Sequence, residues 1–411
     1  MLSKQKALPY FEVVVAGELL KKNAVSVDIV QEIGSHSVAL LRVQYIGVTN
    51  TQGTQGIRGS WQFISEGTPI AVNYGMKPGY LAQFLGYVAS YQILKNATDK
   101  GHSNLIMSTV EYTVVGTSYN MQSTKNRTWK NTSPSAIASQ IAVENGFRGV
   151  IHPYVSAIDY RLQNTSDFRF LAQLAGEIGY HFYVDNTDLY FINPKVILNQ
   201  NNIRQSPTFW MFNTPGMWDT IRSFKPIVGT ITPDGGIVAN RFVTGLNPTT
   251  KKFITASNQP ELFTSPKAQV QSATISQYFR DAPAESLYEA NQKAQAYADR
   301  NLYWLTAECE LRGDFRVKPN ATVEMAGRAL TEADMGTWLV KSVTHSLTMP
   351  APTGAIWDAT YTMCATLVRD QVYTANTSNP GPLAPTVQKV APALIGNIWR
   401  SSNIGAQINA N

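Results

Sequence analysis

The chain has 411 residues, of which 44% are hydrophobic and 15% are charged, well below the roughly 25% charged residues of an ordinary soluble domain. This apolar content excludes an intrinsically disordered chain, and the length predicts two or three domains. The net charge is +6, but Lys and Arg never run longer than two residues, at Lys21–Lys22 and Lys251–Lys252. Sequence-specific nucleic-acid binding is therefore not expected, because such proteins gather their cations on one stripe.

Residues 1–120 predict a strand-rich domain. Segment 38–48 is mostly apolar, and segment 109–114 alternates polar with apolar residues, which is the period of a half-buried strand. Glycines between 53 and 59 punctuate the strands but lack the spacing and the strand-to-helix context of a phosphate-binding loop. They indicate a hairpin loop.

Residues 121–205 change period and predict a small α+β module. Ser133-Pro134 supplies an N-cap and a first-turn proline, and Asn145-Gly146 ends that helix. A second helix is expected over 166–179, followed by a hairpin over 180–192.

Residues 206–370 return to strands and include one helix, which Asp281 and Pro283 introduce. The domain closes with three expected strands, over 322–325, 338–347 and 358–368.

The two strand-rich stretches resemble each other. Segments 71–75 and 322–327 are both short strands that end in glycine, and each precedes two long strands. This similarity predicts an internal duplication of a β-barrel.

No residue pattern in the chain predicts catalysis, a cofactor or a metal ion. Cys309 and Cys364 are too few for a disulfide framework or a zinc site, so two free thiols are expected. The five histidines lack the spacing of metal ligands, and His345 lies in an apolar strand where a buried or rim position is expected. Nucleophile-elbow and phosphate-loop motifs are absent from the sequence.

Two carboxylates are the candidates for the acid–base pair of a hydrolase. Glu308 and Glu310 are two residues apart in a strand pattern and share one face, like a glycosidase pair at first sight. Active pairs come from different strands across a cleft. A solvated strand face is the favoured interpretation.

Neither a membrane span nor a signal peptide is expected. No apolar run approaches the roughly 20 residues that a membrane helix needs. Pro9 and Glu12 interrupt any signal-peptide core near the start. The sequence therefore predicts that the protein is made in the cytoplasm and is not exported by a signal in this chain.

The helical module carries the strongest resemblance to a known family. Segments 128–142 and 164–184 resemble phage baseplate hub proteins, the family of the late-control (protein D) hubs of contractile tails and the hub half of VgrG proteins. Segments 67–75 and 84–88 are similar to that family's first barrel. Segments 317–327 and 336–345 are similar to its closing barrel. The resemblance covers roughly residues 10–370.

The resemblance implies a mainly β fold with an α+β insertion, made of two tandem β-barrels, a helical and hairpin module and an extended tail. The implied domains are 1–120, 121–205, 206–370 and 371–411. It also implies a non-enzymatic homotrimer in the tail baseplate of a virion, assembled in the host cytoplasm, in which six barrels form a ring. Its partners would be a tail tube or distal tube protein and a central spike, and the genome would pass through a channel.

The sequence departs from VgrG proteins after the hub, because no OB-fold or repetitive β-helix follows. The spike is therefore expected on a separate chain. Four prolines between 380 and 392 predict an extended arm in 371–411. A compact apolar patch beyond them is the predicted spike-docking element: Leu394, Ile395, Ile398 and Trp399. The alternative is an ordinary disordered terminus.

Three other functions remain open from the sequence. One is the hub of a phage-related contractile injection system. Another is a tail-borne cell-wall hydrolase that uses Glu308, Glu310 or Asp314 as acid and base. The third is a receptor-binding adhesin with exposed aromatic sugar platforms.

Overall fold

A computed structural model gives the fold, and it describes sixteen stretches of the chain: 8–20, 24–48, 64–77, 79, 81–95, 105–154, 158–194, 206–211, 219–228, 238–246, 250–258, 275–279, 287–299, 305–331, 334–349 and 359–369. Three predicted features lie outside the described residues. These are the glycine loop at 53–59, the helix start at Asp281 and Pro283, and the whole arm 371–411 with its apolar patch.

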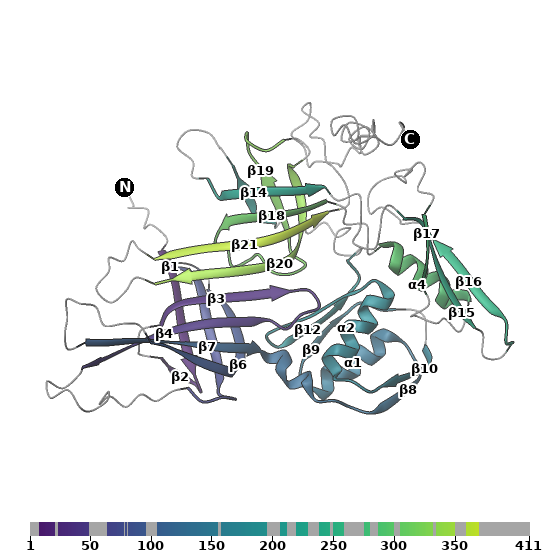
Figure 1. Cartoon of the computed structure of the whole chain (residues 1–411), viewed down its shortest axis with the longest axis horizontal. Coiled ribbons are helices and arrows are strands. Elements are labelled where there is room, and N and C mark those ends of the chain that lie inside the picture. Colours follow the sequence, from purple (N-terminus) through teal and green to yellow (C-terminus); the bar gives the residue numbers. More distant parts are fainter. Residues whose placement is uncertain are drawn as a thin grey trace, which may run out of the picture.

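A single 13-stranded sheet forms most of the molecule, with the strand order β14-β18-β21-β20-β3-β4-β7-β6-β5-β1-β2, and β13 and β19 pair beside β20 (Figure 1). The first half of the chain supplies β1 (Leu8–Val15), β2 (Glu18–Leu19), β3 (Ala24–Glu32), β4 (Val38–Val48), β5 (Pro69–Lys77), β6 (Leu81–Lys95) and β7 (Leu105–Gly116). The second half supplies β13 (Thr208–Trp210), β14 (Ile221–Val228), β18 (Leu305–Arg312), β19 (Thr322–Ala326), β20 (Gly336–Thr348) and β21 (Thr360–Arg369).

The two halves join through their backbones. Strand β20 pairs antiparallel with β3 from Ser342 opposite Glu32 to Thr348 opposite Ser26. The mainly β fold with an α+β insertion is confirmed. The two predicted barrels are two halves of one sheet, each with its own core, rather than separate sheets.

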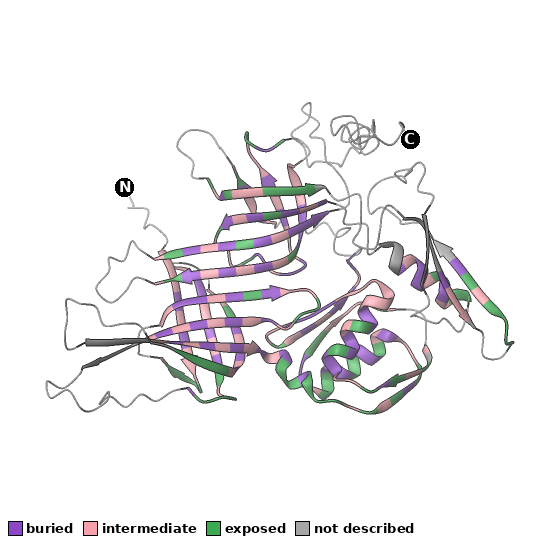
Figure 2. Ribbon diagram, viewed as in Figure 1, coloured by how far each residue is buried: buried purple, intermediate pink, exposed green. Residues whose placement is uncertain are grey.

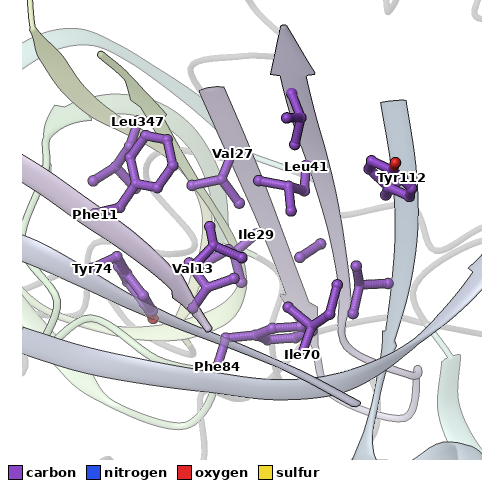
Figure 3. Close-up of a cluster of buried hydrophobic side chains, with 14 of the residues drawn as sticks. Phe11, Val13, Val27, Ile29, Leu41, Ile70, Tyr74, Phe84, Tyr112 and Leu347 are labelled. Atoms are coloured by element: carbon purple, nitrogen blue, oxygen red, sulfur yellow. The ribbon is translucent and has the colours of Figure 1, made fainter. Parts of the chain in front are cut away.

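Each half encloses its own hydrophobic core, because buried and exposed residues alternate along most strands (Figure 2). In the first core, Phe11 and Val13 of β1 face Val27 and Ile29 of β3, and Leu347 of β20 reaches into the same cluster (Figure 3). A residue of the second half thus helps to close the first core. The second core includes Trp338, Val343, Met363 and Leu367.

The predicted internal duplication is confirmed by the strand order. The first half runs β1-β5-β6-β7-β4-β3 across the sheet, and the second runs β13-β19-β20-β21-β18-β14. Taken in chain order, each of these six strands therefore has a counterpart in the other half, whereas the short β2 has none among the described residues. One difference is that β1 is antiparallel to β5, whereas β13 is parallel to β19.

Irregularities of the ladder also match between the halves. Each half has two β-bulges, which add an unpaired residue and bend the strand locally. The bulge between Ala24 and Ser26 of β3 corresponds to the one between Ile221 and Ser223 of β14. The bulge between Val88 and Ser90 of β6 corresponds to the one between Val340 and Ser342 of β20.

A left-handed turn residue stands at the same place in both halves. Gly67 has φ +78° and Asn320 has φ +64°. The Gly67 N–H donates to the Val88 carbonyl at 2.8 Å, and the Asn320 N–H donates to the Val340 carbonyl at 2.9 Å. Glycine and asparagine are the residues that tolerate this conformation, so the duplication extends to backbone dihedral angles.

The predicted α+β module follows β7 and has its own core. Ser133 and Ser166 cap the two helices through their side-chain oxygens, and Gly179 ends the second with φ +73°, as the sequence predicts. Its elements are η1 (Thr117–Gln122), β8 (Arg127–Thr132), α1 (Pro134–Glu144), β9 (Arg148–Ile151), β10 (Ile158–Gln163), α2 (Asp167–Ile178), β11 (His181–Asp185) and β12 (Asp188–Ile192).

A second insertion, between β14 and β18, was not predicted as a separate unit. Helix α4 (Leu287–Asp299) packs on a three-stranded sheet of β15 (Val238–Leu246), β16 (Phe253–Asn258) and β17 (Ile275–Phe279). In Figure 1 this unit lies beside the module, and α4 contacts α2.

Candidate assembly surfaces

The carboxylates that the hydrolase hypothesis requires do not form a cleft pair. Glu308 is exposed on the outer face of β18, as predicted. Glu310 pairs with Arg222 at 3.1 Å, and Asp314 pairs with Arg316 at 2.6 Å. All three lie on open surface or in ion pairs. They do not face one another across a substrate site, as a general acid and a general base must.

His345 is fully buried, as the sequence suggested. Its Nε2 lies 2.9 Å from the Val317 carbonyl oxygen, and its Nδ1 lies 2.9 Å from the Tyr361 hydroxyl. Burial lowers the pKa of His345 to about 4. The imidazole is therefore neutral at pH 7 and links β20, β21 and the 313–321 segment.

Both cysteines are free thiols. Cys309 is buried, and burial raises the pKa of its thiol to about 12. Cys364 is exposed on the opposite face of the same sheet. A thiol with a raised pKa is a poor nucleophile.

Among the described residues, no group of three or more His, Cys, Asp or Glu side chains could hold a metal ion. Within the same part of the chain, no helix has the length and apolarity to cross a membrane.

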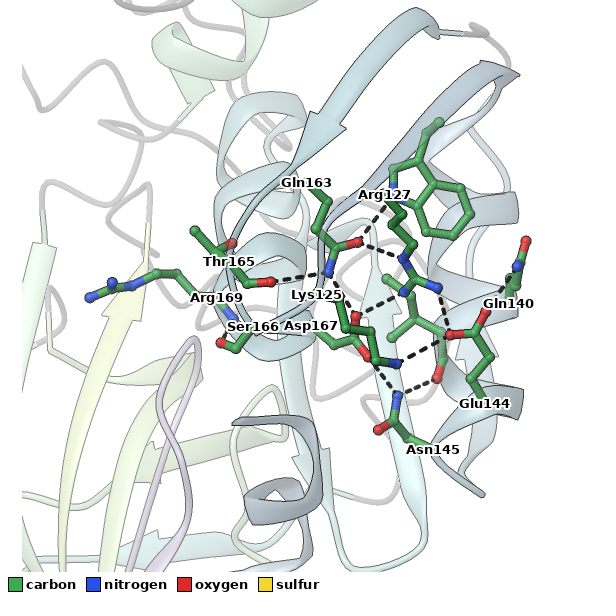
Figure 4. A network of polar contacts seen from close by, with 12 residues as sticks. Lys125, Arg127, Gln140, Glu144, Asn145, Gln163, Thr165, Ser166, Asp167 and Arg169 are labelled. Atoms are coloured by element: carbon green, nitrogen blue, oxygen red, sulfur yellow. Dashed lines mark hydrogen bonds and ion pairs between the residues drawn. The ribbon is translucent and has the colours of Figure 1, made fainter. Parts of the chain in front are cut away.

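A closed polar network holds the α+β module together (Figure 4). The buried Asp167 carboxylate receives Lys125 Nζ at 2.6 Å, Arg127 at 2.8 Å, Gln163 at 2.7 Å and Asn145 at 3.0 Å. Burial acts to raise the pKa of Asp167, but the hydrogen bonds from Lys125, Asn145 and Gln163 outweigh it and the pKa is lowered. The network joins two strands to both helices, so its role is structural.

The module attaches to the sheet through its hairpin. Asn186, at the tip between β11 and β12, accepts the Leu85 N–H at 2.8 Å and donates to the Gln83 carbonyl at 2.8 Å. Next to it, Asp185 pairs with Lys318 of the second half at 2.6 Å. The module is thereby fixed to both halves.

The far end of β6 lies at an edge of the described part of the sheet. Up to Val88, β6 bonds to residues 67 and 68, but beyond it no described strand lies along that edge as far as Lys95. Ile93 is 41% exposed although Val110, its cross-strand neighbour on the same face, is completely buried. Ile93 therefore faces the core side of the sheet but lies at a position that no described strand covers.

Strand β14 is the terminal described strand at one end of the ladder (Figure 1). Ile227 is 50% exposed. Pro226 is also exposed, although it stands opposite the fully buried Ala307. We call these two strand segments, 90–95 of β6 and 224–228 of β14, the β6 edge and the β14 edge.

Comparison with known proteins gives structural but not sequence matches. No protein-family model matches the sequence, and no curated protein does. The 43 kDa tail protein of prophage MuSo2 from Shewanella oneidensis matches with a TM-score of 0.58 and 12% identity, over 88% of this chain and 98% of that one. The tail protein from Neisseria meningitidis MC58 matches with a TM-score of 0.56 and 10% identity, over 89% and 97%.

A third match comes from a secretion machine. It is an Escherichia coli component of the type VI secretion system, described as structurally similar to the T4 bacteriophage tail proteins gp27 and gp5. It matches with a TM-score of 0.50 and 10% identity, over 90% of this chain and 81% of that one. The chain therefore has the fold of phage tail proteins over nearly its whole length, and the predicted resemblance is confirmed at the level of the fold.

Proposed function

We propose that the chain is the structural hub of a phage tail baseplate, a homotrimer that joins a six-fold tail tube to a three-fold central spike. The observation that carries the proposal is the duplication within one continuous sheet. The fold shared with two prophage tail proteins supports the setting. The protein would then be part of the virion and would be assembled in the host cytoplasm.

Symmetry explains why a duplicated chain suits this task. Three copies of a chain with two equivalent halves present a pseudo-six-fold face, which matches a tube, and also keep true three-fold symmetry, which matches a spike. A chain with one such unit would need six copies, and their six identical positions would not single out the three that a three-fold spike contacts.

The hub of a phage-related contractile injection system is the second candidate. The similarity to the Escherichia coli type VI secretion component favours it. Both candidates require the same trimeric adaptor and differ in the machine that contains it. A cell-wall hydrolase is disfavoured, since Glu308, Glu310 and Asp314 lie on open surface or in ion pairs.

Solution mass and a low-resolution image of the purified protein test the proposal. We expect a trimer that appears as a hollow ring with three-fold symmetry and that binds purified tube protein. A monomer with peptidoglycan-cleaving activity would overturn the hub function and support the hydrolase.

The arm 371–411 is proposed as the contact to a separate spike chain, through Leu394, Ile395, Ile398 and Trp399. Its apolar patch follows a proline-rich stretch that suits an extended linker. Truncation after Asp370 is expected to leave the trimer and tube binding intact and to abolish spike capture in a pull-down. Unchanged affinity for the spike would exclude this role.

A further inference from the structure

The β11–β12 hairpin holds the module against the first half of the sheet through backbone groups. The Gly34 N–H, in the turn after β3, donates to the Phe182 carbonyl of β11 at 2.7 Å. The Leu85 N–H of β6 donates to the Asn186 side chain at 2.8 Å. Both donors belong to the sheet and both acceptors belong to the module, so these two hydrogen bonds exist only while the module is in place.

A histidine lies in this contact with the first half. His36, in the turn between β3 and β4, stacks on Phe168 of α2 with the ring centroids 3.7 Å apart, and its Nδ1 lies 2.7 Å from the Ser118 hydroxyl oxygen. Phe168 and Ser118 are both buried. Burial lowers the pKa of His36. The imidazole is therefore packed as a neutral ring between the sheet and the module at pH 7.

The elements packed against His36 leave a charge on its ring uncompensated. Helix η1 has no charged residue, and at the start of α2 the Asp167 carboxylate already binds Lys125 and Arg127. On the turn of His36 itself, Glu32 accepts the Ser35 hydroxyl at 3.5 Å. Burial is the sole cause of the lowered pKa of His36, so none of these charges acts appreciably on the ring.

A second histidine lies where the hairpin meets the second half. The Nδ1 atom of His181, at the start of β11, lies 2.5 Å from the side-chain oxygen of Asn320. Burial lowers the pKa of His181, and the hydrogen bond with Asn320 opposes this effect without cancelling it. His181 is therefore also neutral at pH 7 where it joins the module to the second half.

The charged and titratable groups beside His181 are occupied by one another or neutral. Asp185 of the hairpin pairs with Lys318 of the second half at 2.6 Å. Tyr183, on the same face of β11 as His181, is a neutral phenol because burial raises its pKa. No charged group contributes to the lowered pKa of His181. A proton on this ring would likewise add a charge that nothing described around it neutralises.

We propose that these contacts form an acid-released clamp: protonation of His36 and His181 detaches the β11–β12 hairpin from both halves while the sheet stays folded. Both rings are only partly buried, so water reaches them, whereas His345 is 0% exposed. At neutral pH the hairpin braces the two halves against each other. After detachment the β3–β20 ladder still joins them, but without this brace.

The direction of the response follows from the cost of burying a charge. In the detached state both rings are in water, with pKa values near 6.5, so this state binds more protons than the closed one. The closed clamp is therefore fully stable above about pH 6.5 and loses stability as the pH falls toward the lowered pKa values. Between pH 7 and pH 5, each histidine raises the equilibrium constant for detachment by at most about 25-fold.

Hydrogen exchange of single amides tests the clamp in the full-length protein. The Gly34 and Leu85 amides report detachment, because their acceptors lie on the module. The Gly67 amide is the matched control, since it is also a glycine amide at positive φ but donates within the first half, to the Val88 carbonyl at 2.8 Å. From pH 7 to pH 5 the protection factors of Gly34 and Leu85 should fall at least about 10-fold, and that of Gly67 should change less than about 2-fold.

Removing the titration should remove the response. His36→Asn combined with His181→Asn keeps a polar atom near the Nδ1 position of each ring but cannot be protonated, so the Gly34 and Leu85 amides should keep their pH 7 protection at pH 5. The control is His152→Asn. His152 lies inside the module, where its Nδ1 accepts the Asn193 N–H at 3.1 Å, and this variant should leave the response unchanged.

The unmodified protein provides a test that no folding defect of a variant can obscure. Exchange of the imidazole C2 hydrogen, followed by mass spectrometry, titrates each histidine separately. The midpoints of His36 and His181 should lie below 6.5 and coincide with the pH at which Gly34 and Leu85 lose protection.

Several results would overturn the clamp. They are constant protection of Gly34 and Leu85 down to pH 5, a loss that Gly67 shares, histidine midpoints that do not coincide with the loss, and a response that persists in the double variant. The clamp belongs to a single chain, so each of these results would leave the hub standing. Solution mass and imaging test the hub separately.

Discussion

The two halves of the sheet share a backbone design but fill it with different side chains. At one pair of corresponding positions the first half has Gly86 and the second has Trp338, which is 1% exposed. At another pair the first half has Tyr112 and the second has Ala365. Large and small residues have changed places at these two pairs of positions. Strand order and bulges are therefore maintained while the packing inside them is exchanged.

The halves also differ in what is inserted. A short turn over 33–37 joins β3 to β4 in the first half, whereas β14 and β18 in the second are separated by β15, β16, β17 and α4. The insertion leaves the pairing of β14 with β18 in register with its counterpart. Connections on the surface tolerate such additions because they do not enter the core.

The largest expected effect tests whether the halves unfold together. Trp338→Ala and Tyr112→Ala each remove a large buried side chain, one from each core, and each should cost about 3–5 kcal/mol of unfolding free energy. Because β3 and β20 share a ladder, both variants should shift the same single transition in guanidinium unfolding followed by circular dichroism. Val143→Ala, at a position 77% exposed on α1, is the control. Two transitions, each sensitive to one variant, would show independent halves.

The second-largest expected effect is a difference between the halves in how their stability depends on acid pH. The folded-state pKa of His345 is lowered to about 4 by burial, so its contribution to stability is fully present above the unfolded value near 6.5 and is lost as the pH falls to about 4. The loss is about 3 kcal/mol. The first half has Ile93 at the corresponding position, which does not titrate.

The check is the free energy of unfolding measured between pH 7 and pH 4. His345→Leu should flatten the pH dependence relative to Tyr361→Phe, which removes the hydrogen bond but keeps the imidazole. His36 and His181, whose pKa values burial also lowers, account for the remaining slope in this window. Asp167 and the other carboxylates with lowered pKa values act only nearer pH 4 and below. An unchanged slope in His345→Leu would contradict the assignment.

A smaller effect is expected at Gly86, which stands in the first half where the second half has Trp338. A Cβ at Gly86 would lie 2.4 Å from the Val115 carbonyl oxygen, so Gly86→Ala forces the backbone to shift and should cost about 1–3 kcal/mol. Thermal unfolding measures this cost. A neutral result would mean that β6 and β7 separate easily at this point.

The smallest expected effect tests whether the turns at Gly67 and Asn320 are equivalent. Gly67→Asn copies Asn320 into the first half and should change stability by less than about 0.5 kcal/mol, whereas Gly67→Val should cost about 1–3 kcal/mol because a β-branched residue is strained at positive φ. Chemical unfolding of the two variants provides the comparison. Equal costs for both would argue against a shared left-handed turn.

Local signals in the sequence were sufficient to predict the helices and the hairpin of the α+β module. The serine caps at Ser133 and Ser166, the αL glycine at Gly179 and the 181–192 hairpin all depend on residues within one or two turns of one another. The duplication could also be predicted, because the short strands ending in glycine leave a pattern in the chain.

The joint and the edges could not be predicted in the same way. Pairing of β3 with β20 brings together residues more than 300 positions apart, and no local pattern specifies which strand edges meet. The separate β15–β17 sheet was missed because its strands resemble those of the second half. The exposure of Ile93 depends on which of the described strands lie beside β6, and only the three-dimensional order reveals that.

The β3–β20 joint also has a mechanical consequence. Its hydrogen bonds run across the strands, so a load directed along the strand axis acts on all seven paired positions at once. A load directed across the strands opens them one after another and meets far less resistance. The joint is therefore stiff to shear and weak to peeling. Thrust that reaches this protein along β3 and β20 would pass between its halves with little deformation.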